Sequence, residues 1–305
     1  MNKESTRLKR SFLTKARDWQ RIWSKGHDCP IIENRKEVLL TKDAAKAGKN
    51  FYSDDFNIIK AVKNPQKFNN MLRSEHIPFN MFIPLDIDND KEYCKKIFNK
   101  IIGNKIESID DKLIIEYKPK PEKDYFYLKD NTSFDVYIEY TRIGGKGEKG
   151  IIGIEIKYTE REYKLNKKRD HEQIQKINDQ ESPYYKVTKK SNAYKEECIC
   201  KLKEDNYRQI WRNHILGESI VHSPLQKDEK FKEFISITIY PEENEHFEKV
   251  SKEYPKFLND EKKCLFITYE KLFDLFETHC KDMDSSKKVK YENWIKWMRE
   301  RYIVN

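Results

Sequence analysis

The sequence of 305 residues has no long hydrophobic run. No stretch approaches the roughly 18 consecutive apolar residues that a membrane-spanning helix needs. Residues 1–20, MNKESTRLKRSFLTKARDWQ, contain no apolar signal core either. We therefore expect a cytoplasmic protein that makes no contact with a membrane.

Sequence motifs of several protein classes are also absent. The six cysteines form no C-x-x-C pair, so neither a disulfide framework nor a structural zinc site is expected. There is no G-x-S-x-G, no P-loop G-x-x-x-x-G-K-[ST] and no H-E-x-x-H, so nothing supports a covalent-nucleophile enzyme or ATP-driven translocation by this chain. No internal repeat is present, which excludes solenoids and propellers.

Charged residues are abundant instead. They make up 37% of the chain, and 61 Lys and Arg against 52 Asp and Glu give a formal charge of +9. An aromatic content of 13% argues against disorder. The positive charge favours a polyanionic partner. The basic segments 1–25 and 186–203 either grip phosphates without reading sequence or are ordinary solvated surfaces.

The central part of the sequence alternates between helical and strand-like patterns. A helix is predicted in which Phe68, Met71, Leu72 and Glu75 share one face and which Pro78 ends. Runs rich in β-branched and aromatic residues predict strands at 112–119, 133–142, 150–160, 234–240 and 264–270. The order helix, three strands, helices, strand, helix, strand, helix is typical of an α/β fold.

The length favours two domains, or one large domain with insertions. We predict a basic helical N-terminal region at 1–65, a core at 66–275 and a C-terminal helical extension at 276–305. Within the core, residues 161–203 form a charged insertion, which Pro183 prevents from being one unbroken helix.

The strands at 133–142 and 150–160 are joined by the glycine-rich loop IGGKGEKG, which favours an antiparallel hairpin. Side chains alternate between the two faces of a strand. One face is therefore predicted to be apolar, carrying Phe134, Val136, Ile138 and Tyr140 on the first strand and Ile152, Ile154, Ile156 and Tyr158 on the second. The other face brings Asp135, Glu155 and Lys157 together, with Gly153 leaving room beside them.

Two carboxylates and a lysine in this arrangement suit a hard divalent cation. Mg²⁺ prefers oxygen ligands and keeps waters for phosphate oxygens and for an attacking water. Lys157 could orient or help to deprotonate that water and offset the negative charge of a phosphate. Glu116, on the first strand, could line the same cleft. The alternative is that these are ordinary charged residues of a half-exposed strand, and that Glu75 reaches solvent at a helix end.

A helix is predicted at about 204–217, with a buried stripe of Tyr207, Ile210, Trp211, His214 and Ile215. Gln209, Arg212 and Asn213 are turned away from this stripe. Arg212 and Asn213 could touch phosphate, but a solvated helix face explains them equally well.

The segments SFDVYIEY and GIEIKYTE, with SEHIPFN before them and RQIWRNHIL after them, resemble the PD-(D/E)XK nuclease superfamily over residues 66–217, in its bacterial restriction-endonuclease-like branch. Asp135 matches the motif aspartate, although it follows Phe134 and not a proline, and Glu155-Ile156-Lys157 matches the (D/E)XK half. The resemblance implies a restriction-endonuclease-like core of helix, three-stranded antiparallel start, helix and strand, with helical N-terminal and C-terminal additions. It also selects Glu75 as a further acidic site residue and Gln209 as the glutamine beside the site.

The resemblance implies a Mg²⁺-dependent endonuclease, with Mn²⁺ as a substitute, that hydrolyses phosphodiester bonds. The expected substrate is double-stranded DNA, in a restriction or defence role, and the expected metal ligands are Asp135, Glu155 and Glu75. A homodimer is expected, because cutting a duplex requires two active sites. Three alternatives stay open: an RNase of the same fold, a non-catalytic nucleic-acid-binding protein, and a chance motif in a protein that binds another protein.

Overall fold

The computed structural model describes residues 10–87, 91–110, 113–119, 128, 130, 132–223 and 231–304. Part of the basic N-terminal segment, including Lys3, Arg7 and Lys9, and the first residue of the predicted strand 112–119 lie outside the described residues. Among the described residues, no helix combines the length and the apolar character needed to cross a membrane.

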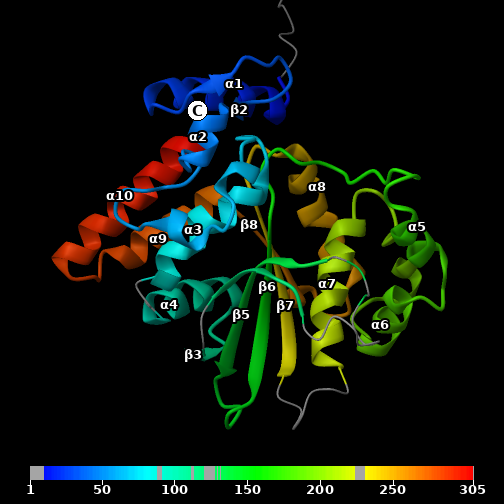
Figure 1. Ribbon diagram of the computed structural model, residues 1–305. Helices are drawn as coiled ribbons and strands as arrows, with labels where there is room; N and C mark the ends of the chain where they lie inside the picture. Colours follow the sequence, from blue (N-terminus) through cyan, green and yellow to red (C-terminus); the bar gives the residue numbers. More distant parts are fainter. Residues whose placement is uncertain are drawn as a thin grey trace, which may run out of the picture.

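A mixed sheet forms the centre of the molecule (Figure 1). Its strands are β3 (Ile106–Ile109), β4 (Ile114–Tyr117), β5 (Phe134–Arg142), β6 (Lys149–Ile156), β7 (Phe231–Tyr240) and β8 (Cys264–Thr268). The order is β3-β5-β6-β7-β8, and β4 also pairs with β5. Strands β3, β4, β5 and β6 pair antiparallel, whereas β6, β7 and β8 pair parallel. The α/β fold and the hairpin are confirmed; the short strand β3 was not predicted.

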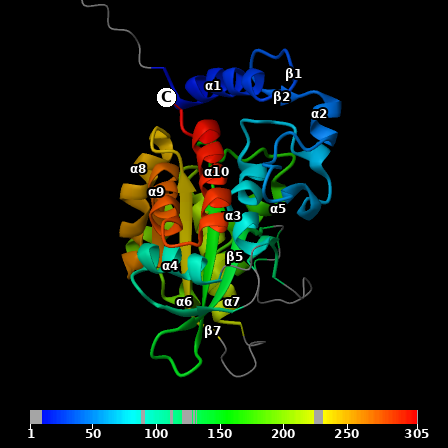
Figure 2. The ribbon, with the colours of Figure 1, turned by 90° about the vertical axis from the view of Figure 1, so that its left-hand side faces the viewer.

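Helices cover both faces of the sheet (Figures 1 and 2). One face carries α3 (Ile77–Ile87), α4 (Lys91–Ile102), α9 (Tyr269–Cys280) and α10 (Ser285–Tyr302). The other carries α5 (His171–Asn178), α6 (Pro183–Ser191), α7 (Arg208–Val221) and α8 (Glu245–Glu253). The sheet therefore separates two hydrophobic clusters. Along most of β5, β6, β7 and β8, side chains that point to opposite faces enter different clusters.

Two glycines allow α7 to lie close against the sheet. A Cβ at Gly153 of β6 would lie 2.5 Å from the ring of Phe134, and one at Gly217 of α7 would lie 2.3 Å from the ring of Phe234. Phe134 departs from the predicted alternation, because its ring packs with Tyr137 and Phe234 on the α7 face. The close approach of α7 brings the polar side of the helix over the hairpin.

The predicted helix ending at Pro78 is wrong. Residues 65–76 contain two short 3₁₀ segments, η2 (Pro65–Lys67) and η3 (Ser74–His76), and α3 begins at Ile77 with Pro78 in its first turn. A proline is tolerated there because the first backbone N–H groups of a helix have no intrahelical partner. The backbone of residues 69–71 is used elsewhere: Leu40 N donates to Asn69 O and Met71 N donates to Val38 O.

The N-terminal region contains α1 (Phe12–Gly26), the strand pair β1 (Ile31–Ile32) and β2 (Leu39–Leu40), and α2 (Lys42–Lys46). Helix α1 lies across one end of the molecule beside the C-terminus, and Gln20 donates to Arg301 O at 2.7 Å (Figures 1 and 2). Buried side chains of all three predicted regions, among them Phe12, Ile152 and Tyr302, belong to one hydrophobic cluster. The boundaries at 65 and 275 therefore fall inside a common core and stay a prediction.

The segment 161–203, predicted to be a charged insertion, does not form one unbroken helix. It contains α5, α6 and the 3₁₀ segment η4 (Glu196–Lys201), and Pro183 is the first residue of α6.

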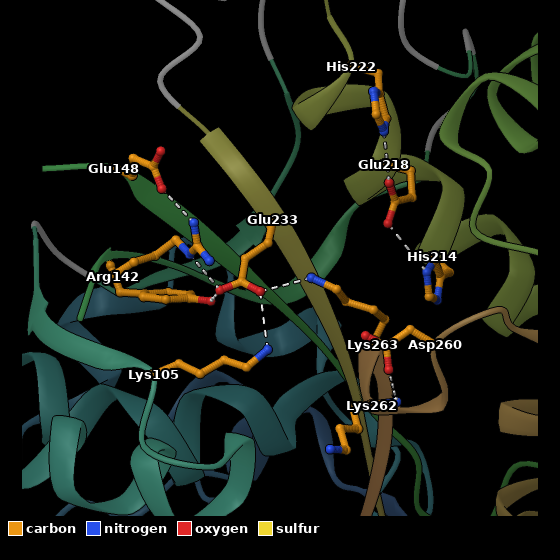
Figure 3. A network of polar contacts seen from close by, with 11 residues as sticks. Lys105, Arg142, Glu148, His214, Glu218, His222, Glu233, Asp260, Lys262 and Lys263 are labelled. Carbon is orange, nitrogen blue, oxygen red and sulfur yellow. Dashed lines mark hydrogen bonds and ion pairs between the residues drawn. The ribbon is translucent and has the colours of Figure 1, made fainter. Parts of the chain in front are cut away.

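A carboxylate at one end of the sheet is surrounded by cations (Figure 3). Glu233, near the start of β7, accepts hydrogen bonds from Arg142 Nε at 3.0 Å, Lys263 Nζ at 2.8 Å, Lys105 Nζ at 3.2 Å and Tyr140 Oη at 2.9 Å. Burial opposes ionisation, but the hydrogen bond and charge of Lys263, helped by the other donors, lower the pKa of Glu233 to about 2. This end of the strands is thus fixed by ion pairs.

Candidate active site

Asp135 and Glu155 lie opposite each other on β5 and β6, at the end of the sheet away from Glu233. The antiparallel register pairs Val136 with Ile154, so Asp135, the residue before Val136, lies opposite Glu155, the residue after Ile154. Asp135 Oδ2 accepts a hydrogen bond from Ile156 N at 2.7 Å. The hairpin therefore brings the two predicted carboxylates into one site.

Lys157 completes this group directly after β6. Its Nζ donates to Glu155 Oε1, and its side chain is only 4% exposed. The backbone of Lys157 is fixed on both sides, because its N–H donates to Ile239 O at 2.8 Å and its carbonyl accepts from Tyr269 Oη at 2.6 Å. The three side chains predicted to meet do so; their catalytic role stays a prediction.

Helix α7 supplies two amides to the same carboxylate. Gln209 Nε2 donates to Glu155 Oε1 at 3.0 Å, and Asn213 Nδ2, one turn further along, donates to Glu155 Oε2. The structure thus places Gln209 beside the predicted carboxylates. Asn213 was not selected as a site residue, although its i+4 spacing from Gln209 puts both amides on one helix face.

The charges in the site are not balanced. Burial and the negative charge of Glu155 raise the pKa of Asp135 well above its ordinary value, although Lys157 opposes this. Burial also lowers the pKa of Lys157, but Glu155 and Asp135 outweigh it, so that the pKa of Lys157 is raised. Lys157 is therefore protonated, paired with Glu155 and attracted by the charge of Asp135.

Glu160 is a further carboxylate near the site that the sequence did not single out. Its Oε1 accepts from Ser74 N at 2.8 Å and from Ser74 Oγ at 2.9 Å, and its Oε2 accepts from Tyr158 N at 2.6 Å. Its negative charge contributes to the raised pKa of both Asp135 and Lys157. No motif marks this residue, since its position depends on contact with the distant segment at Ser74.

Glu75 lies in a neighbouring groove and is 58% exposed, with Arg73 Nη1 at 3.9 Å. Within the described part of the chain, no hydrogen bond or ion pair joins Glu75 to Asp135 or Glu155. The groove, of about 780 Å³, is also lined by Glu116 and Lys67.

Glu116 stands opposite Asp135 in the β4–β5 register, but its φ of +54° interrupts the alternation of β4. Ile115 and Tyr117 consequently pack on different faces of the sheet. Burial and the charge of Glu75 raise the pKa of Glu116, while Lys67 opposes them. The negative charge of Glu75 thus acts on Glu116 within the groove.

The residues able to hold a metal are Asp135 and Glu155. Among the residues that the structure describes, no group of three or more His, Cys, Asp or Glu side chains is arranged to hold a metal ion. Asp135 nevertheless keeps capacity for another ligand, since its hydrogen bond from Ile156 N is its single one within the described residues. A hard dication would also relieve the repulsion that raises the pKa of this carboxyl.

The family model described as the PD-(D/E)XK nuclease superfamily matches residues 6–304, nearly the whole chain. No curated protein and no solved structure matches the chain.

Proposed function

The chain belongs to the PD-(D/E)XK nuclease superfamily, and we propose that it is a metal-dependent endonuclease that hydrolyses phosphodiester bonds of DNA. Members of this superfamily are generally nucleases, so the proposal concerns the substrate, the metal and the residues. The observation that carries it is the convergence of Asp135, Glu155 and Lys157 on adjacent strands, with Gln209 and Asn213 holding Glu155.

Asp135 and Glu155 are the proposed Mg²⁺ ligands, and Mn²⁺ should substitute. Their donor set fits a hard cation, because both offer carboxylate oxygens and their mutual repulsion favours an added positive charge. When bound, the metal would polarise a phosphoryl oxygen and make a coordinated water more acidic. Glu75 stays a proposed third acidic residue, within the groove next to Glu116.

Lys157 is proposed to stabilise negative charge on the phosphate and to orient the attacking water. Its raised pKa favours the protonated form, which supports these two roles over that of a general base. Gln209 and Asn213 are proposed positioning residues that keep the Glu155 carboxylate directed into the site. In the hydrolysis, water attacks phosphorus in line with the P–O bond that breaks.

The wider proposal is a restriction-endonuclease-like core made of α3, β4, β5, β6, α7 and β7, acting in bacterial restriction or defence. A homodimer and a cytoplasmic location are part of the same proposal.

Incubation of the purified chain with plasmid DNA, single-stranded DNA and structured RNA tests this function, each with Mg²⁺, Mn²⁺ or EDTA. Cleavage should require the metal and fall at least about a hundredfold in Asp135→Ala and Lys157→Ala. Glu148→Gln is the control, because Glu148 lies in the turn at the other end of the hairpin and is 41% exposed. Cleavage retained in the two site variants would refute the residue assignment.

The same experiment separates DNA from RNA. Cutting of structured RNA alone would replace the proposed substrate by the RNase alternative, and binding without cutting of any substrate would favour a non-catalytic binder.

A further inference from the structure

A basic segment lies between Lys157 and α7. Residues 161–169, REYKLNKKR, contain five cationic side chains against one acidic one, a net charge of +4 out of +9 for the whole chain. Nine residues thus carry nearly half of the net charge. The cations are Arg161, Lys164, Lys167, Lys168 and Arg169, and all five residues are exposed.

The first part of this segment, residues 161–163, is held at both ends by hydrogen bonds close to the candidate site. It begins four residues after Lys157, where the carboxylate of Glu160 is held by Ser74. The carbonyl of Tyr163 then accepts a hydrogen bond from Arg208 Nη2, and Arg208 directly precedes Gln209. The segment therefore starts and is anchored within a few residues of groups that touch Glu155.

The second part, residues 164–169, contains an ordered turn. Asn166 N donates to Asp170 Oδ2 at 2.8 Å, Asp170 N donates to Asn166 O at 2.8 Å, and Lys168 N donates to Asn166 Oδ1 at 2.9 Å. Leu165 packs against the hydrophobic cluster on the α7 face. Because the backbone is already fixed, ordering the backbone costs little free energy when a ligand binds Lys167 or Lys168.

The charges of this segment are only partly neutralised. Lys164 pairs with Glu162 at 3.2 Å and Arg169 pairs with Asp170 at 2.9 Å. Within the described part of the chain, Arg161, Lys167 and Lys168 form no ion pair.

The basic stretch 186–203 differs in this respect. Lys190 donates to His222 O, Lys195 donates to Lys256 O, and Lys201 lies over the ring of Phe257. Several cations of that stretch are thus used within the fold, whereas Arg161, Lys167 and Lys168 form no ion pair within the described part of the chain.

From these observations we infer that residues 161–169 bind the phosphate backbone of the nucleic acid next to the scissile bond. Unpaired lysine and arginine side chains release counterions from a polyanion when they bind it, and they contact phosphates without reading bases. This inference rests on the proposed nuclease function, which it extends by naming the surface that holds the substrate.

The test compares two triple variants of the full chain. Arg161→Gln/Lys167→Gln/Lys168→Gln removes the unpaired cations of the segment. Lys100→Gln/Lys256→Gln/Lys281→Gln removes the same charge from exposed positions on α4, next to α8 and after α9. Binding of a labelled DNA duplex and of a structured RNA is measured by fluorescence anisotropy in EDTA at several salt concentrations, and thermal midpoints verify folding.

For duplex DNA, each lost phosphate contact should reduce the slope of log K against log salt by about 0.9, so the segment variant should lose about 2 to 3 from this slope. Its dissociation constant at low salt should rise at least about tenfold, and in a cleavage assay KM should rise while kcat stays close to that of the wild type. The control variant should lose far less affinity. Equal binding by the segment variant and the wild type, or equal losses in both triple variants, would overturn the inference.

Binding and cleavage are separate readouts, so the two proposals fail in different ways. A wild-type chain that cuts DNA while the segment variant binds normally refutes the phosphate-binding segment alone. A wild-type chain that binds through the segment but cuts nothing refutes the nuclease proposal. A wild-type chain that binds neither nucleic acid overturns both.

Discussion

Substitution of Glu233 by glutamine should reveal how strongly one end of the sheet is held together. The Glu233 carboxylate is 5% exposed and is contacted by Lys105, Arg142 and Lys263, whose side chains are 27–34% exposed (Figure 3). The glutamine side chain keeps a similar shape but removes the negative charge. Three neighbouring cations would then repel one another without a shared carboxylate.

The pKa of Glu233 gives the size of the effect. A carboxyl whose pKa falls from its ordinary 4.5 to about 2 contributes about 3 kcal/mol of stability at neutral pH, because each pKa unit corresponds to about 1.4 kcal/mol. Solvent screens the partly exposed lysines, so we expect Glu233→Gln to lose about 2–3 kcal/mol. This agrees with the loss of about 3–5 kcal/mol that follows removal of one partner from a fully buried ion pair.

The pH dependence has a defined sign. Since the folded-state pKa is depressed, the contribution of Glu233 is fully present above its ordinary pKa of 4.5 and is lost as the pH falls through about 2. The stability difference between wild type and variant should therefore be constant near pH 7 and disappear between about pH 4.5 and 2.

Urea unfolding followed by circular dichroism, at pH 7 and at pH 3, measures this difference. Glu148→Gln is the matched control, because Glu148 pairs with Arg142 but is 41% exposed, and its loss should stay below about 1 kcal/mol. Cleavage by Glu233→Gln should persist under conditions where the protein is folded, since Glu233 lies at the other end of the strands. A loss below about 0.5 kcal/mol, or a difference that grows in acid, would refute the reasoning.

Three further predictions concern the candidate site and its surroundings. Asp135→Asn should abolish cleavage yet raise the free energy of unfolding by about 1 kcal/mol at pH 7, because burial and Glu155 raise the pKa of Asp135. In thermal melts this gain in stability should shrink in acid, where the wild-type carboxyl is protonated, and a loss of stability at pH 7 would contradict the charge argument. Asn213→Ala should lower kcat about tenfold with little change in KM. It should also lower the free energy of unfolding in urea by about 1–2 kcal/mol, since it removes a buried donor to Glu155. An unchanged kcat would exclude a positioning role for Asn213. Arg212→Gln should lower the free energy of unfolding in urea by about 2 kcal/mol, because the Asp130 carboxylate, 11% exposed, would lose the guanidinium that lies 3.0 Å away. An unchanged free energy of unfolding would mean that solvent already compensates the charge of this pair.

The sequence was sufficient for the part of the site that depends on local periodicity. Alternation along two strands and a short connecting loop placed Asp135, Glu155 and Lys157 together, because an antiparallel hairpin is set by nearby residues. The helical period also turned Gln209 and Asn213 away from the buried stripe, and the structure brings both to Glu155. Here the local pattern and the tertiary arrangement agree.

The parts that depend on distant contacts could not be predicted in this way. The segment before Pro78 has helical spacing, but pairing of residues 69–71 with the backbone near Val38 and Leu40 prevents a helix and leaves Glu75 exposed in a side groove. Glu160 reaches its position through Ser74, more than eighty residues earlier in the chain. The positive φ of Glu116 likewise interrupts an alternation that the sequence of β4 would otherwise predict.

The two ends of the central strands have opposite charge balance, and this separates stability from chemistry. At the start of β7, one carboxylate is shared by three cations, and its pKa is depressed. At the end of β6, Lys157 is the neighbouring cation of both Glu155 and Asp135, and the pKa of Asp135 is raised. Neutralising a carboxylate should therefore destabilise the protein at the first end and stabilise it at the second. The proposed metal site, with its two neighbouring carboxylates, can persist because the sheet is fixed by ion pairs at its other end.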